Sequence, residues 1–228
     1  GGDFDGNTDV VGQRLNGQGN LLWNDGIGVV ALISTPQLAR KPIAVSDGAG
    51  GIIVVIELEF TSGEFAGFTD IVAQRINPSG AILWSSDGSP VAVTATAFSE
   101  RNPVAISDGQ GGVIVAAELE FLQDVGGVQV ADRDLVAQRV DADGVRLWSD
   151  GNTQILIGTD HNDHRVAMAS DGAGGAFFIA EFEFLFGDLL GDTDIVGQYV
   201  TASGFLPWGN GVLLRGTNDI ERRPAVIA

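Results

Sequence analysis

Three pairs of glutamates are the residues in this sequence whose type and spacing could support chemistry. Successive side chains of a β-strand point to opposite faces, so the two carboxylates of a Glu-x-Glu pair lie on one face, about 6 to 7 Å apart. Two carboxylates so placed suit a hard cation such as calcium, or the acid and base of a glycosidase. The pairs, each followed by Phe, are Glu57 and Glu59, Glu118 and Glu120, and Glu181 and Glu183.

A structural role for the same glutamates is the competing interpretation. Buried charges are normally paired, and arginines recur at fixed distances from the pairs. Because the pattern occurs three times, whereas catalytic centres seldom repeat, the sequence favours one ion-pair network in each repeat. The network is predicted to join Glu57, Glu59, Glu118, Glu120, Glu181 and Glu183 to Arg40, Arg75, Arg101 and Arg139.

A second candidate for a metal lies near the start of the chain, where Asp3, Asp5, Asn7 and Asp9 place oxygen ligands at alternate positions. This spacing resembles a calcium loop, although the glycine is displaced from its EF-hand position and no Glu stands at the twelfth position. A solvated turn is the alternative. We expect no resident cofactor, with calcium at these four residues as the other outcome.

These residues belong to an internal repeat of about 61 residues. Its marks are Ser-Asp-Gly-x-Gly-Gly, the Glu-x-Glu-Phe pair, Asp-[Ile/Leu/Val]-Val-[Ala/Gly]-Gln, and a Gly-x-x-x-Trp segment that recurs at Trp23, Trp84, Trp148 and Trp208. We expect one repeat domain over residues 1–228. Its copies span approximately 1–38, 39–99, 100–161, 162–221 and 222–228, the first partial and the last only begun.

Turn signals divide each copy into four short apolar segments, which predict four antiparallel strands. In the second complete copy they are residues 104–106, 113–121, 135–140 and 145–148 onward. The second segment is apolar at consecutive positions, so both faces of its sheet should be covered. The sequence therefore predicts an all-β, β-propeller-like fold of about four repeats of four strands. An open β-repeat array or solenoid is the alternative.

The repeat resembles one found in secreted and surface proteins of bacteria, with the pattern Pro-Ala-x-x-Ser-Asp-Gly-x-Gly-Gly, Asp-Ile-x-Ala-Gln-Arg and Gly-x-x-x-Trp. Residues 103–115 and 70–75 carry the likeness, which covers nearly the whole chain. The resemblance implies a propeller-like extracellular module with a binding or structural role, and it implies no catalytic reaction. This chain departs from the pattern on the second strand, where it has Glu-x-Glu-Phe instead of Trp and Asp.

Composition limits the partners. Thirty acidic residues against twelve basic ones give a net charge of −18, which opposes binding to nucleic acid. No apolar run approaches the roughly 18 residues of a membrane-spanning helix, so we expect no membrane insertion. With no cysteine, the chain has no disulfide and no thiolate nucleophile. The remaining partners are copies of itself, other surface proteins, or glycans.

The ends of the sequence fall within copies, and a ring of four complete copies would need about fifteen further residues. This predicts a segment of a longer repetitive protein, or a gap that a neighbouring molecule fills. Open ends also fit a filament subunit, because a head-to-tail contact that does not close produces a fibre.

The function expected from these observations is a non-catalytic, extracellular structural or adhesive repeat protein, as a subunit or segment of a bacterial surface filament. A carbohydrate- or protein-binding propeller module is the alternative, and a glycoside-processing enzyme is the weaker hypothesis. A binding module predicts exposed aromatics that are not shared by every copy. The candidates are Phe65, Phe68, Phe98 and Phe186.

Overall fold

The computed structural model describes residues 8–217 and 220–227, and this part of the chain is built almost entirely of antiparallel β-strands. It holds three four-stranded sheets and one two-stranded sheet. We call β1 (Val10–Gly12) and β2 (Val30–Ile33) the half-sheet. Within the described ranges no helix is long and apolar enough to cross a membrane.

The three complete sheets each consist of four strands that are consecutive in sequence and adjacent in space. Sheet A contains β3 (Leu38–Ser46), β4 (Ile52–Glu59), β5 (Thr69–Ile76) and β6 (Val91–Thr94). Sheet B contains β7 (Ser99–Ser107), β8 (Val113–Val125), β9 (Val128–Val140) and β10 (Gln154–Ile157). Sheet C contains β11 (Asn162–Ser170), β12 (Ala176–Glu183), β13 (Thr193–Val200) and β14 (Val212–Arg215). The predicted all-β class, with four antiparallel strands in a repeat, is confirmed.

The fourth strand begins later than the sequence predicts. Residues 145–148 make an isolated bridge between Arg146 and Val140, and β10 starts only after the short 3₁₀ turn Ser149–Gly151. The side chain of Gln138 holds this segment, because its Oε1 accepts the Trp148 N–H at 2.8 Å and its Nε2 donates to the Trp148 carbonyl at 3.0 Å. The glutamine of the repeated motif therefore positions the tryptophan.

The consecutive apolar residues of the second strands are explained by the stacking of the sheets. Ile53 and Val55 of β4 pack in a cluster with sheet B, whereas Val54 and Ile56 pack in a cluster with the half-sheet. Because side chains alternate between faces, a strand that is buried on both faces has apolar residues at every position.

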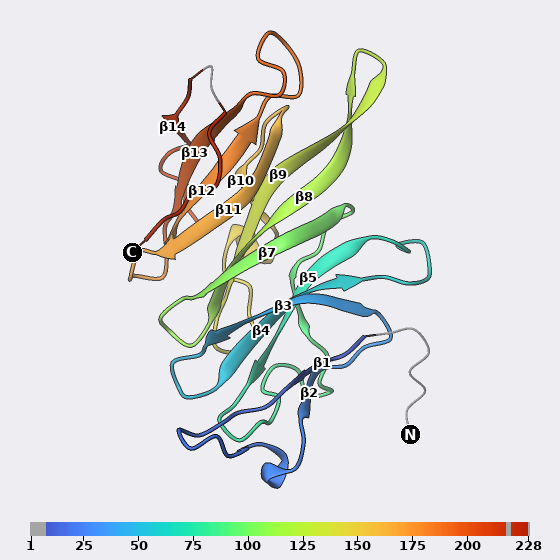
Figure 1. Cartoon of the computed structure of the whole chain (residues 1–228), viewed down its shortest axis with the longest axis vertical. Helices are drawn as coiled ribbons and strands as arrows, with labels where there is room; N and C mark the ends of the chain where they lie inside the picture. Colours follow the sequence, from blue (N-terminus) through green and yellow to red (C-terminus); the bar gives the residue numbers. More distant parts are fainter. Residues whose placement is uncertain (1–7, 218–219, 228) are drawn as a thin grey trace.

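The sheets follow one another along the long axis of the molecule, with the half-sheet toward one end and β14 toward the other (Figure 1). The first strands of successive sheets contact one another, so β7 lies against both β3 and β11. Contacts between neighbouring sheets are therefore repeated along the stack.

Sheet B contains the main departure from regular repetition. Its strands β8 and β9 have 13 residues each, whereas β4, β5, β12 and β13 have 8. The extra length forms a hairpin that projects from the stack in Figure 1 and turns at Gly126 and Gly127. Both glycines have positive φ, which this tight turn requires.

Candidate functional site

The aspartates of the Ser-Asp-Gly motif each organise a turn, and two of them, Asp47 and Asp108, also bind an arginine. Asp47 Oδ1 accepts the N–H groups of Ala49 at 2.9 Å and Gly51 at 2.8 Å, and Asp47 Oδ2 lies 3.0 Å from Arg75 Nη2. Burial alone would raise the pKa of Asp47, but these hydrogen bonds and the guanidinium lower it below its usual value. The charged carboxylate is thus the form that the turn stabilises.

The positions of Arg75 and Arg139 differ from the expected network, because neither arginine contacts a glutamate pair. Arg139 binds Asp108 at 2.9 Å, as Arg75 binds Asp47. The strand register explains the difference: Arg75 lies opposite Ile53 on β4, four residues before Glu57. Each guanidinium also donates to the next sheet, Arg75 to the Ala142 carbonyl at 2.8 Å and Arg139 to the Ala202 carbonyl at 3.3 Å.

The second glutamates of the pairs lie at the sheet surface. Arg40 Nε is 2.6 Å from Glu59 and Arg101 Nε is 3.0 Å from Glu120, and Arg133 binds Glu120 as well, at 3.0 Å. Glu183 instead receives a long hydrogen bond, 3.5 Å, from Asn162 Nδ2. These partly exposed pairs add little to stability.

The first glutamates are buried and connect neighbouring sheets. They accept the backbone N–H of a residue at positive φ, which for Glu57 and Glu118 lies in a β-bulge of the next sheet's first strand and for Glu181 is Arg223, beyond β14 and outside any strand. We call the residues in the bulges of the three first strands, Lys41, Asn102 and Arg165, the bulge residues. The contacts are Asn102 N to Glu57 at 2.6 Å, Arg165 N to Glu118 at 2.9 Å, and Arg223 N to Glu181 at 2.7 Å.

The bulge side chains complete a continuous line of contacts along the stack. Each of these side chains reaches the buried glutamate of its own sheet, and the backbone N–H groups of Asn102 and Arg165 also bind the glutamate of the sheet before. The contacts are Lys41 with Glu57 at 2.8 Å, Asn102 with Glu118 at 2.7 Å, and Arg165 with Glu181 at 2.7 Å. Glu57 and Glu118, whose carboxylates have the chemistry of an acid, a base or a metal ligand, therefore hold neighbouring sheets together.

The sequence patterns did not predict two pairs of carboxyl groups between sheets, each with one buried and one half-buried member. Glu100, on β7, is fully buried beside Asp70, on β5, and its Oε1 accepts the Thr96 N–H at 3.0 Å. Burial, together with the Asp70 charge, raises the pKa of Glu100 to about 7. Within the described residues Glu100 Oε2 has no hydrogen-bond partner. This pair is therefore stable when one of its two carboxyl groups is protonated.

A second pair has the same position between sheets B and C. Burial raises the pKa of Asp163 to about 8 and that of Asp134 to about 6, and Asp132 contributes like charge to both. The signal in the sequence is an acid directly before the Arg or His of the first strand, as in Glu100-Arg101 and Asp163-His164. Repetition of that acid could have identified these positions.

The residues predicted to bind calcium are only partly described. Asp3, Asp5 and Asn7 lie outside the described residues, and Asp9 is exposed just before β1. Across residues 8–217 and 220–227, no three His, Cys, Asp or Glu side chains are grouped as a metal site would require.

Three of the four repeated tryptophans are buried between sheets. Trp23, Trp84 and Trp148 are at most 2% exposed, and each indole N–H donates to a carbonyl of the following sheet or turn. The acceptors are Pro78 at 3.0 Å, Ala142 at 2.9 Å and Ala202 at 3.2 Å. Trp208 differs, because it is 38% exposed.

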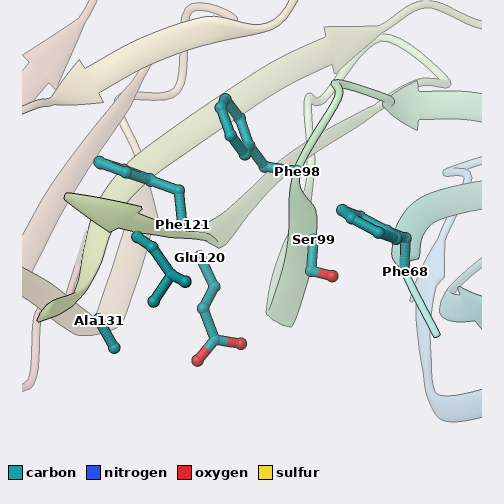
Figure 2. Close-up of a pocket in the computed structure, with 7 residues that line it drawn as sticks. Phe68, Phe98, Ser99, Glu120, Phe121 and Ala131 are labelled. Atoms are coloured by element: carbon teal, nitrogen blue, oxygen red, sulfur yellow. The ribbon is translucent and has the colours of Figure 1, made fainter. Parts of the chain in front are cut away.

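An apolar cavity of about 390 Å³ opens where the long hairpin of sheet B meets sheet A. Figure 2 shows Phe98 beside Phe121 and Phe68 apart from them, beyond Ser99, with the Glu120 carboxylate and the Ser99 hydroxyl also lining the cavity. Of the exposed aromatics predicted for a binding module, Phe68 and Phe98 therefore share a cavity. Phe65 packs near Phe68, and Phe186 packs against His161 on sheet C.

The cavity has the composition of a ligand site, since it is apolar with few polar groups. Two of the residues that line it, Leu122 and Ala131, belong to the extra length of β8 and β9, which the corresponding strands of sheets A and C lack. No family model, curated protein or solved structure matches the chain. The function is therefore inferred from the contacts of the described residues and from the sequence.

Proposed function

We propose that this chain is a non-catalytic structural or adhesive repeat protein that acts outside the bacterial cell. The observation that carries the proposal is the line of contacts through Glu57, Glu118 and Glu181. Glu57 and Glu118 each accept a backbone N–H of the following sheet, and Glu181 accepts that of Arg223, beyond β14, so all three carboxylates are already engaged in structural contacts. An acid or base for glycoside chemistry would instead face a substrate.

The architecture behind this function is propeller-like. The first strands of sheets A, B and C contact one another in turn, and sheets A and B are covered by neighbours on both faces, which is how propeller blades pack. Such sheets joined end to end would form a surface filament, and this chain would be one subunit or segment of it. The resemblance noted in the sequence supports the extracellular location.

Two measurements test this proposal. Antibodies against the protein should label intact source cells, and electron micrographs of the protein isolated from those cells should show filaments with a regular axial repeat. Labelling that requires permeabilised cells would contradict the location. Dispersed discs in the micrographs would instead favour a closed propeller module, and ligand screening would be the next step.

A binding module is the second candidate, favoured by the cavity of Phe68, Phe98 and Phe121. Aromatic faces beside a carboxylate and a hydroxyl suit a sugar ring or an apolar side chain of a partner protein. A glycan array and a binding screen with surface extracts test it. Phe98→Ala should abolish a specific signal, while Phe186→Ala, which changes an exposed aromatic outside the cavity, should leave the signal unchanged.

The proposed function includes no cofactor. Calcium at Asp3, Asp5, Asn7 and Asp9 is retained as the alternative, and a chelator distinguishes the two. A melting temperature that is unchanged by chelator supports a metal-free protein, whereas a decrease that added calcium reverses would assign calcium a structural role.

A further inference from the structure

Trp208 and the residues around it form a surface that lacks its usual covering. Trp208 is 38% exposed, whereas Trp23, Trp84 and Trp148 are 2%, 2% and 0% exposed. Leu214 on β14 is 54% exposed, whereas its equivalents Leu32, Val93 and Leu156 are 4%, 0% and 1% exposed. We call Trp208, Leu214 and the stacked rings of Phe177 and Tyr199 the Trp208 surface.

Three contacts within the molecule show what covers the equivalent tryptophans. Each buried tryptophan packs on a turn glycine of the next sheet and on the last apolar residue of that sheet's third strand. A Cβ at Gly144 would lie 3.0 Å from Trp84, and Val140 belongs to the same cluster as Trp84. Gly80 and Ile76 meet Trp23, and Gly204 and Val200 meet Trp148, in the same way.

The complementary half of this contact is also exposed on the chain, in the segment that joins β1 to β2. Leu15 corresponds to Ile76, Val140 and Val200, and it is 58% exposed although each of those is fully buried. Gly19 corresponds to Gly80, and no atom lies within 4 Å of the position of a Cβ built on it.

The turn that presents Gly19 already has the geometry of the buried turns. Asn16 Oδ1 accepts the N–H groups of Gln18 and Asn20, both at 2.9 Å. Asn77 and Asp141 hold their own turns in the same way, with matching distances of 2.9 Å. The carbonyl of Gly17 therefore takes the place of the carbonyls of Pro78, Ala142 and Ala202, which accept indole N–H bonds.

We infer that the Trp208 surface of one molecule binds the residue 15–19 turn of a second copy, with Trp208 seated on Gly19 and Leu15 and its indole N–H donating to the Gly17 carbonyl. This inference rests on the proposed structural function and specifies the contact that joins one molecule to the next. The two surfaces lie toward opposite ends of the stack, so the contact is head-to-tail and repeats from molecule to molecule (Figure 1). An interface of this kind that does not close generates a filament.

One feature distinguishes the contact from the internal ones. Arg14, Arg75 and Arg139 each donate to a carbonyl of the following turn, but Tyr199 stands in the equivalent position and donates to Asp171 instead. The intermolecular contact lacks this charged hydrogen bond, so it should be weaker than the internal contacts and reversible on dilution.

Two substitutions that block opposite surfaces test the contact by sedimentation of the purified protein. Trp208→Ala and Leu15→Asp should each weaken self-association by about 30-fold or more, the loss of an interface hot spot. An equimolar mixture of the two variants should form dimers and stop there, because one intact surface remains on each. Phe65→Ala and Leu122→Asp, which change exposed apolar residues outside both surfaces, should assemble like the unaltered protein.

Quenching of tryptophan fluorescence by iodide provides a second readout that does not depend on size. Trp208 is the exposed tryptophan, so the quenched fraction should decrease as the protein is concentrated, and this change should be absent in Leu15→Asp. The contact is overturned if the unaltered protein stays monomeric, if either variant assembles normally, or if the folded variants fail to form mixed dimers. Labelling of intact cells would still test the proposed function in each of those cases.

Discussion

At the scale of single residues, Glu118 is the buried glutamate that binds donors of both sheet B and sheet C. Its carboxylate accepts hydrogen bonds from Asn102 Nδ2 at 2.7 Å and Arg165 N at 2.9 Å, and Arg133 Nε lies at 3.8 Å. Removing it leaves partly buried donors unpaired in two sheets. We therefore predict that Glu118→Ala lowers the free energy of unfolding by about 3 kcal/mol, measured by urea denaturation.

Glu64→Ala is the matched control, because Glu64 is exposed in the loop between β4 and β5. Its effect should stay within about 0.5 kcal/mol. Glu118→Gln, which keeps one acceptor, should fall between the two. Equal effects of Glu118→Ala and Glu64→Ala would contradict the role given to the buried line.

Glu100 leads to a prediction about pH. Its pKa is raised from 4.5 to about 7 in the folded protein, so between these values the folded state binds more protons than the unfolded state. The contribution of the protonated carboxyl to stability is full below about pH 4.5 and is lost as the pH rises through 7. Glu100→Gln mimics the protonated form, so it should stabilise the protein at pH 8, on the order of 2 kcal/mol, and flatten the decline between pH 5 and 8.

Unfolding curves at pH 5 and pH 8 measure this effect. Glu64→Gln, which alters an exposed carboxyl, should leave the difference between the two pH values unchanged. A pH dependence that is the same in Glu100→Gln and in the unaltered protein would show that the Asp70–Glu100 pair does not titrate as described.

At the scale of elements, the fit between a tryptophan and the following turn determines how closely two sheets approach. Gly144 has φ of +85°, and a Cβ there would lie 3.0 Å from Trp84 Cγ, whereas Gly126 has φ of +63° with open space around it. Alanine should cost about 1 kcal/mol at Gly126, from backbone strain alone. At Gly144 it should cost about 2 to 4 kcal/mol, because the clash with the indole is added. Thermal denaturation of both variants tests this, and equal losses would mean that the sheets separate easily.

The elements themselves were largely predictable, because turn residues and period-two patterns act locally. Consecutive apolar residues in β4 and β8 predicted sheets covered on both faces, and the clusters on their two sides confirm it. The fourth strand was misplaced, because the side chain of Gln138 fixes residues 145–148 as a turn from ten residues away. Such a contact has no local signal.

At the scale of the whole molecule, charge opposes the head-to-tail contact. Each molecule carries a net charge of −18, so two molecules repel one another at low salt. Raising sodium chloride from about 0.01 to about 0.1 M shortens the Debye length from about 30 to about 10 Å, and this should strengthen self-association. Sedimentation at the two salt concentrations measures the change, and Trp208→Ala should remain monomeric at both. Association that weakens with salt would indicate a contact held by ion pairs instead of by Trp208.

The sequence by itself determined the repeat, the all-β class and the segments that become strands, because spacing and side-chain alternation are local properties of the chain. Only the tertiary structure decided which charges meet. Arg75 and Arg139 bind Asp47 and Asp108 instead of the glutamates, since antiparallel register places them at the other end of the strand. Stacking likewise brought the Glu100 and Asp163 carboxyls against Asp70 and Asp134 and left Trp208 uncovered, because burial between sheets depends on which neighbour is present.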